Sequence, residues 1–374
     1  MENDKDKYWL AFASIEKIGS VFIKTLYEHF GCIEQAWNAH IEDLHQIETL
    51  TRRQINDFLE CKKNVNPDEC LELIQKKKIK FINYTDTEYP ELLKQIYNPP
   101  MTLFYKGDLS RCNFNRTLAV VGSRKASEAA KTVLTKILSG FKGTDICVVS
   151  GLALGIDSCA HKAAIDSDIS TIGVIASGFD FIYPTQNKDL YKKIEEKSGV
   201  IFSEYWPTFQ PLQWRFPHRN RIVTGLCKGT LVAEAAIKSG ALISANLCLE
   251  QNRELMCMPG LLTNPNTEGI YKLIKNGAAV ITRHEDILEA LGWQIETQNE
   301  TTTNTDSYID KLDLEDSEKE VFLTIATEAK NFDNIMLETE IDFGDLMVIL
   351  TNLEIKGYIK QTDGEKYMSI INVN

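Results

Sequence analysis

Seven short apolar runs alternate with segments of helical length between residues 118 and 282, and this alternation constrains the fold more than any other feature. The runs are LAVVG, ICVVSG, TIGVIASG, GVIFSEY, GTLVAEA, ELMCMPG and AAVIT. Nearly continuous hydrophobic runs are typical of strands that are buried on both faces of a parallel sheet. Helical segments such as SEAAKTVLTKILSGF lie between several of them, so the order predicts a doubly wound α/β sheet.

The residues before this region predict helices, followed by an entry to the sheet. Residues 1–75 show helical periodicity, and the piece IEKIGSVFIKTLYEHFG resembles one helix-hairpin-helix unit, in which a glycine hairpin offers backbone N–H groups to a DNA phosphate. A later segment, IETLTRRQINDFLE, has Leu50 where a glycine would be needed for a second hairpin of this kind. The alternative is therefore a small helical packing domain without DNA contact. From residue 76, short apolar pieces around three prolines predict an entry strand, a short helix and an edge strand.

The composition changes again after Gly292. Residues 293–312 are rich in threonine, asparagine and charged residues, which predicts a linker. Residues 313–374 show three helical segments and a hairpin turned by Asp363-Gly364, which is a winged-helix pattern. The sequence thus predicts domains at 1–75, 76–292 and 313–374.

The formal net charge of −12 is unevenly distributed. Basic residues number 13 against 17 acidic ones in residues 1–100, 22 against 18 in 101–290, and 6 against 18 in 291–374. The acidic tail would repel a phosphate backbone, whereas the mildly basic centre would tolerate one. Scattered cysteines and histidines predict free thiols and no metal site. No apolar run is long enough for a membrane span and the N-terminus is charged, so we expect a cytoplasmic protein without a membrane contact.

Three glycine-bearing pieces carry the candidate site residues. In the first, the strand LAVV ends at Gly122, and Ser123 and Arg124 are expected at the start of the next helix. Backbone N–H groups, a hydroxyl and a guanidinium at a helix N-terminus favour an oxyanion, and arginine adds bidentate phosphate contacts. An ordinary strand-to-helix turn with a surface arginine is the alternative.

The second piece contains Ser150, Gly151, Gly155 and Asp157, with His161 four residues further along the same helical face. Asp157 could cap this helix and orient His161. A catalytic pair is conceivable, but no nucleophile is in register, which favours a structural cap and a packed histidine.

The third piece, WRFPHRNRIV, is the most informative. It places Phe216 and Trp214 beside Arg215, Arg219 and Arg221, with Asn220 between the last two. Aromatic planes interleaved with arginines suit stacked bases in a cationic groove. The alternative is an ion-pair cluster of these arginines with Glu204 and Glu234.

A different class of function is also open. A nucleotide N-glycosidase could use Glu234 as its acid-base residue and Arg221 for phosphate, although the P-G-G-x-G-T turn of phosphoribohydrolases is absent before Gly229-Thr230. A pure protein-interaction scaffold is a third possibility.

The three pieces occur in one order with further motifs and resemble the DNA-processing protein A family, DprA/Smf. The motifs are GSR, SGLALGIDSCAH, GFDFIYPTQN at 178–187, SEY, FPHRNRI, SGALISA and PG. The resemblance is strong over residues 89–292 and looser on either side. It implies an extended Rossmann-like domain between the helical (helix-hairpin-helix or SAM-like) domain and the winged helix.

The resemblance also implies a function without enzymatic activity or cofactor. Such a protein binds single-stranded DNA, dimerises through the Rossmann-like domain, and loads the RecA recombinase onto incoming strands while single-strand-binding protein is displaced. On this sequence, the groove would be formed by Gly122, Ser123, Arg124, Ser150, Gly151 and Gly178, with Arg215, Phe216, Arg219, Asn220 and Arg221 holding bases and backbone. The acidic C-terminal domain is expected to contact protein rather than DNA.

Overall fold

The computed structural model describes residues 5–294, 314–325, 330–339, 341–362 and 366–370, and it divides into two compact units, residues 1–294 and 295–374. Each unit is described by itself. No helix in these ranges is long and apolar enough to cross a membrane.

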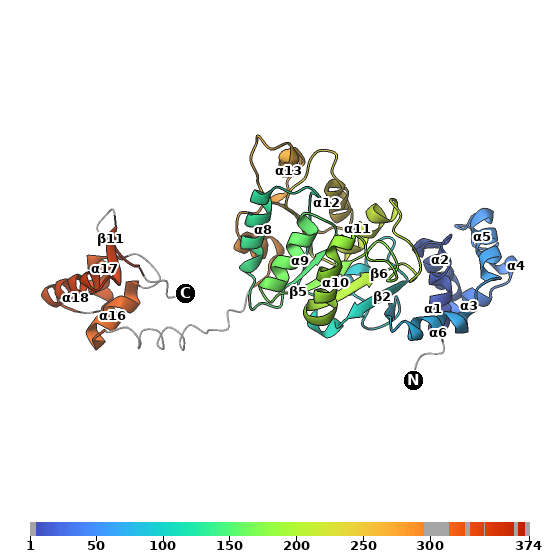
Figure 1. Cartoon of the computed structure of the whole chain (residues 1–374), viewed down its shortest axis with the longest axis horizontal. Helices are drawn as coiled ribbons and strands as arrows, with labels where there is room; N and C mark the ends of the chain where they lie inside the picture. Colours follow the sequence, from blue (N-terminus) through green and yellow to red (C-terminus); the bar gives the residue numbers. More distant parts are fainter. Residues whose placement is uncertain (1–4, 295–313, 326–329, 340, 363–365, 371–374) are drawn as a thin grey trace. The chain divides into compact units, whose positions relative to one another are not determined.

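The first unit begins with six helices, which lie at the blue end of the chain in Figure 1 and pack around an aromatic core. Phe12 packs against Trp37 and Phe58, with ring centroids 5.0 and 5.3 Å apart. The side chain of Thr51 caps one of these helices by accepting from Gln54 N at 3.3 Å, as Ser, Thr, Asp and Asn do at helix starts. The helices are α1 (Asp6–Ala13), α2 (Ser20–Phe30), α3 (Ile33–Asn38), α4 (Ile41–Leu44), α5 (Arg52–Lys62) and α6 (Pro67–Lys76).

A nine-stranded sheet follows, in the order β1-β2-β6-β5-β4-β3-β7-β8-β9. All seven predicted strands are present and parallel, and the predicted entry and edge strands, β1 and β2, add to it antiparallel at one end. The strands are β1 (Lys80–Asn83), β2 (Thr102–Gly107), β3 (Thr117–Val121), β4 (Cys147–Ser150), β5 (Ser170–Val174), β6 (Gly199–Ser203), β7 (Gly229–Val232), β8 (Glu254–Cys257) and β9 (Ala279–Val280).

Helices cover both faces of the sheet, because successive residues of a strand point to opposite faces. On β3, Ala119 and Val121 belong to one buried cluster, and Leu118 and Val120 belong to another. The first cluster takes residues from α11 (Arg215–Gly225), α12 (Gly240–Glu250) and α13 (Glu268–Lys275), and the short α7 (Glu91–Lys94). The second takes residues from α8 (Glu128–Ser139), α9 (Ile156–Asp166) and α14 (His284–Leu291). The predicted doubly wound α/β arrangement is therefore confirmed.

The strand order reverses direction at β3. The chain passes from β3 to β4, β5 and β6 on one side, with α10 (Lys188–Lys193) before β6, and then returns to β7 on the other side of β3. In an open α/β sheet, such a switch point leaves a crevice outside the carboxyl ends of the strands. The fold thus indicates where a ligand would bind.

The first unit ends two residues later than predicted. Trp293 is buried in the second cluster, and the Gln294 carbonyl accepts a hydrogen bond from Arg116 Nη2 at 2.8 Å. Most of the predicted linker lies outside the described residues. Residues 1–75 and 76–292 share one unit, and the domain boundary between them stays a prediction.

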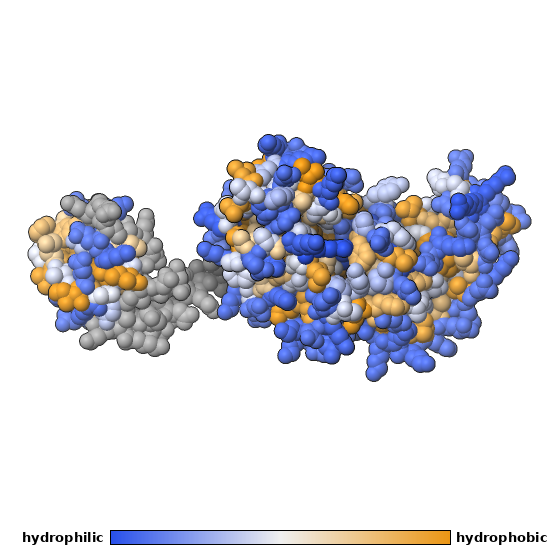
Figure 2. Space-filling model, turned by 45° about the horizontal axis from the view of Figure 1, so that its top comes forward, coloured by the Kyte–Doolittle hydropathy of each residue, from blue (hydrophilic) through white to orange (hydrophobic). Residues whose placement is uncertain are grey.

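The described residues of the second unit form three helices and a three-stranded antiparallel sheet. They are α16 (Asp316–Ile325), α17 (Phe332–Thr339) and α18 (Phe343–Ile355), with β10 (Lys330–Asn331), β11 (Ile359–Thr362) and β12 (Lys366–Ser369) in the order β10-β12-β11. The predicted Asp363-Gly364 turn lies outside the described residues, and the winged-helix assignment stays a prediction. Figure 2 shows apolar residues reaching the surface of both units among a mostly hydrophilic covering.

Candidate functional site

A groove of about 670 Å³ lies at the switch point. Its walls come from the loop after β3, from residues after β4, from the loop after β7 with the start of α12, and from the first turns of α11. Four lining residues are basic and one is acidic; they are Arg124, Lys125, Arg219, Lys238 and Asp157. This surplus of positive charge favours an anionic ligand.

Backbone hydrogen bonds to residues after β7 and at the start of α9 hold the loop after β3 in place. Ser123 N donates to the Glu234 carbonyl at 2.8 Å, and the Ser123 carbonyl accepts from Ile156 N at 3.1 Å. Helix α8 begins at Glu128, with Ser127 as its N-cap. The prediction that Ser123 and Arg124 start this helix is therefore wrong, because Ser127 supplies the capping oxygen four residues later.

Two loops cross where Gly155 lies. A Cβ at Gly155 would be 2.2 Å from the Ser123 carbonyl oxygen and 2.6 Å from that of Arg124, and φ is +82°. Only glycine accepts this conformation and this close approach. Gly155 consequently supports the loop that presents Arg124, while Gly122 packs against the Ile156 side chain.

Arg124, Phe216 and Tyr183 form an aromatic and cationic platform at the groove. The Arg124 guanidinium carbon lies 5.3 Å from the Phe216 ring centroid. The ring centroids of Tyr183 and Phe216 are 5.4 Å apart, with an interplanar angle of 55°. Arg124 is exposed, Phe216 is half-buried and Tyr183 is 49% exposed. Exposed aromatic faces beside an arginine are suited to stacking with flat ring systems and to binding phosphate.

Arg219 lines the bottom of the groove, but its side chain is buried, at 4% exposure. Its Nη1 donates to the carbonyl of Gly151 at 2.6 Å and to that of Val174, at the carboxyl ends of β4 and β5. Burial lowers the pKa of Arg219 and raises that of Asp157, and each charge partly offsets the shift of the other. Arg219 therefore donates hydrogen bonds to carbonyls at the ends of β-strands. The geometry does not favour its predicted direct contact with a DNA strand.

Gly151 leaves room for this buried pair. A Cβ there would lie 2.6 Å from Arg219 Nη2 and 2.7 Å from Asp157 Oδ2. The Asn220 side chain, which lines the groove, accepts from Arg219 Nε at 3.2 Å.

Arg215 is enclosed by aromatic rings on the other side of α11. Its guanidinium carbon is 4.7 Å from the Tyr205 ring centroid, and it also faces Phe209 and Trp214. Nη1 donates to the Gln210 carbonyl at 2.5 Å, and Nη2 pairs with Glu16 in the loop between α1 and α2. At 1% exposure, Arg215 joins the helical region to α11 and does not line the groove as predicted.

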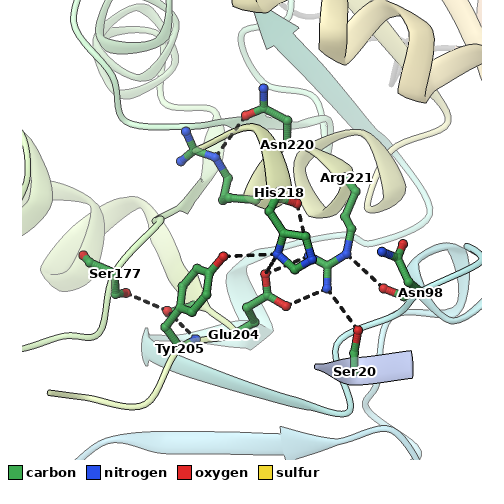
Figure 3. Close-up of polar contacts among 10 residues, drawn as sticks. Ser20, Asn98, Ser177, Glu204, Tyr205, His218, Asn220 and Arg221 are labelled. Carbon is green, nitrogen blue, oxygen red and sulfur yellow. Dashed lines mark hydrogen bonds and ion pairs between the residues drawn. The ribbon is translucent and has the colours of Figure 1, made fainter. Parts of the chain in front are cut away.

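Arg221 forms a buried bidentate ion pair with Glu204 (Figure 3). The two nitrogen–oxygen distances are 2.7 and 2.5 Å, and His218 Nδ1 lies 3.0 Å from the same carboxylate. Burial alone would raise the pKa of Glu204, but Arg221 and His218 lower it to about 2. This part of the ion-pair alternative is confirmed, and Arg221 is not free to hold phosphate.

Ser150 and Gly178 lie inside the fold and do not line the groove. Ser150 Oγ donates to the Val120 carbonyl at 2.6 Å, which joins β4 to β3. Gly178 packs against the Trp206 and Pro207 carbonyls, where a Cβ would be 2.1 and 2.3 Å away. Both were predicted to line the groove. Instead, both hold together the strands and loops beneath it.

Asp157 does not cap α9 or contact His161. The N-cap is Gly155, and the Asp157 carboxylate accepts from Ala153 N at 3.3 Å. His161 Nδ1 lies 2.7 Å from Thr171 Oγ1, whose hydroxyl donates to the Val148 carbonyl, so Nδ1 donates to Thr171. Burial lowers the pKa of His161 to about 3, so this histidine is neutral at pH 7 and structural.

Glu234 and Arg221 are not placed as the glycosidase hypothesis requires. Glu234 is 1% exposed, and its Oε2 accepts from Ser127 N at 3.0 Å and from Ser127 Oγ at 2.7 Å. It pairs with the start of α8, while Arg221 pairs with Glu204. The geometry gives this alternative no support, and the part of the ion-pair hypothesis that involved Glu234 is wrong.

Sequence reasoning missed several lining residues, among them Lys125, Tyr183 and Lys238. Tyr183 belongs to the motif GFDFIYPTQN, where an aromatic residue beside a proline was an available signal. Lys238 directly precedes Ser239, the N-cap of α12, whose hydroxyl accepts from Ala241 N at 3.2 Å. It thus places a positive charge next to a helix N-terminus, which itself favours anions.

These features define a class of protein: a doubly wound α/β protein with a basic, aromatic-edged crevice at its switch point. Residues 80–292 match the family described as DNA recombination-mediator protein A. Protein Smf of Synechocystis is 32% identical over 98% of this chain and 99% of its own length. The chain therefore belongs to the DNA recombination-mediator protein A family, DprA/Smf.

Two solved structures are similar to the chain. The X-ray structure of DprA from Streptococcus pneumoniae has a TM-score of 0.67 and 33% identity, covering 77% of this chain and 97% of that one. DprA from Helicobacter pylori, whose structure is described as showing a single-stranded DNA binding mode, has a TM-score of 0.51 and 27% identity, covering 57% of this chain and 95% of that one.

Proposed function

We propose that this protein binds single-stranded DNA in the switch-point groove and acts as a recombination mediator. The observation that carries the proposal is the platform of Arg124, Phe216 and Tyr183. It combines an exposed guanidinium with two aromatic rings, which suits phosphate capture beside stacked bases and needs no base-specific contact. The related H. pylori protein, described as binding single-stranded DNA, supports the same ligand.

The wider role rests on family membership. We propose that the protein protects incoming single strands and loads RecA onto them during natural transformation, while single-strand-binding protein is displaced. A homodimer formed through the Rossmann-like domain, a cytoplasmic location and a function without catalysis belong to the same proposal. The acidic second unit would contact a protein partner, because α18 contains no lysine or arginine to meet phosphate.

Two substitutions test the site. Phe216→Ala removes a stacking surface and should weaken binding of labelled oligothymidylate by about 1–3 kcal/mol, which is roughly five- to hundredfold. Arg124→Ala removes one phosphate contact and should reduce the slope of log affinity against log salt by about 0.7. Lys142→Ala, at an exposed lysine in the loop after α8, is the control and should bind as the wild type does.

Fluorescence anisotropy over a salt series, with single-stranded and duplex DNA compared, gives these values. Wild-type affinity in both groove variants would refute the assignment of the groove. Equal affinity for duplex and single strands would contradict the proposed substrate.

A further inference from the structure

A second cavity lies on the opposite side of the first turn of α11, within the same unit. It has a volume of about 280 Å³ and is lined by Trp214, Arg215 and His218 on one side and by residues 15–20 of the N-terminal hairpin on the other. The groove described above begins at the neighbouring residues, since Gln213 and Phe216 line it. The start of α11 therefore separates two adjacent hollows.

Trp214 stands out among the tryptophans of this chain. It is 55% exposed, whereas the other four, Trp9, Trp37, Trp206 and Trp293, are all between 4% and 9% exposed. Its ring has the Arg215 guanidinium carbon at 5.1 Å and the His218 ring centroid at 6.2 Å. A large aromatic surface left open beside a cationic group is suited to a stacking partner.

The charges around this cavity do not oppose a phosphate backbone. Its two carboxylates are each matched by an arginine, Glu16 by Arg215 and Glu204 by Arg221. Lys17 adds an ammonium group, 58% exposed and 4.0 Å from Asp57.

One buried donor at the cavity also lacks an acceptor. Arg215 Nε makes no hydrogen bond among the described residues, although the side chain is 1% exposed.

We propose that single-stranded DNA continues from the groove across the start of α11 and stacks a second base on Trp214, with the N-terminal hairpin as the far wall. This inference rests on the proposed function and adds a second contact to it. Trp214 and Phe216 are two residues apart and open into different hollows, so one strand long enough to cross the turn contacts both. A short strand occupies only the groove.

Intrinsic fluorescence tests this directly, because Trp214 is the only exposed one of the five tryptophans. The full-length protein is titrated with oligothymidylates of about 6 and about 20 nucleotides, which lie near the lower end of common single-strand site sizes and above their upper end. We expect the longer strand to quench tryptophan fluorescence and the shorter one to bind without quenching. Trp214→Phe should remove the quenching and keep the affinity.

Affinity measured by anisotropy provides the second readout. Trp214→Ala should lower affinity for the longer strand roughly five- to hundredfold and leave the shorter strand unaffected, whereas Phe216→Ala weakens both. Lys17→Glu should also weaken the longer strand alone.

The outcomes separate this inference from the proposed function. Tight binding of the longer strand without quenching, and with wild-type affinity in Trp214→Ala, would overturn the second contact and leave the groove intact. No binding of either strand by the wild type would overturn the proposed function and this inference together. The Trp214→Phe variant keeps an aromatic side chain at the position, so loss of affinity in it would also count against stacking.

Discussion

The glycine at position 155 shows how one residue controls the presentation of the loop that carries Arg124. Its missing side chain lets the loop after β4 touch the carbonyls of Ser123 and Arg124. The platform geometry depends on this contact, because Arg124 itself is exposed and its side chain has few other restraints. Arg124 is therefore positioned mainly through its backbone.

Gly155→Ala should destabilise the protein and weaken DNA binding together. The backbone of Gly155, with φ +82° and ψ −123°, lies outside the left-handed helical region and costs about 1–3 kcal/mol for a residue with a side chain, and the new Cβ would also collide with two carbonyl oxygens. Gly143→Ala is the matched control, since Gly143 has φ of +76° with no atom within 4 Å of the added Cβ. Urea unfolding should show a larger loss for Gly155→Ala, and only this variant should lose oligonucleotide affinity; equal losses would contradict the crossing-loop argument.

At the scale of elements, α11 distributes its charged and aromatic residues in different directions. Arg215 faces the N-terminal helices, Phe216 faces the groove, Arg219 faces the ends of β4 and β5, and Arg221 faces Glu204. Residues of an α-helix turn by about 100° per position, so Arg221 points away from Arg215 and Arg219. The last two are four residues apart on one face, and they differ because each is buried against a different partner. Pro217 in the first turn of α11 was the available sign of a helix start.

The Glu204 carboxylate connects three elements and predicts a pH dependence. Its ion pair with Arg221 joins the end of β6 to α11, and Arg221 Nη2 reaches Ser20 of α2 at 3.5 Å (Figure 3). Because the pKa of Glu204 is lowered from 4.5 to about 2, its charge contributes stability that is fully present above pH 4.5. That contribution is lost as pH falls toward 2.

Glu204→Gln should therefore reduce the free energy of unfolding by about 3 kcal/mol at pH 7. The difference from wild type should shrink progressively between about pH 4.5 and pH 2, where the wild-type carboxylate is protonated. Urea unfolding at pH 7, 4 and 3 measures it. Glu289→Gln, at an exposed glutamate of α14, is the control, and a difference between Glu204→Gln and wild type that is independent of pH would argue against the ion pair as the cause.

At the scale of the whole molecule, charge is divided between the two units. Residues 291–374 carry 18 acidic and 6 basic residues, which accounts for the entire net charge of −12, so residues 1–294 are neutral overall. Each unit has its own buried core. The groove lies in the unit without net charge, and we expect the acidic unit to act on bound DNA only through charge repulsion.

Removing residues 295–374 should therefore leave DNA binding intact. We expect affinity for oligothymidylate to stay equal or to rise at low salt, and the difference to vanish at high salt because exposed charges are then screened. Anisotropy of the fragment and of the full chain over a salt series measures this. A loss of affinity at every salt concentration would mean that the second unit contacts DNA.

The sequence by itself determined the doubly wound sheet, its seven parallel strands and the loop that carries Arg124. These features follow from local periodicity and from glycines at strand ends, which are patterns among neighbouring residues and do not depend on tertiary contacts. The family was also readable from motif order alone.

Only the tertiary structure decided which side chains face the groove. Arg215, Arg219 and Arg221 look equivalent in sequence, but burial against Glu16, strand-end carbonyls and Glu204 removes them from the surface. Tyr183 and Lys238 reach the groove from loops far from Phe216 in sequence. The sequence gives the position of each arginine in the chain. The role of its guanidinium depends on whether packing leaves the group exposed to solvent or buries it beside a partner inside the protein.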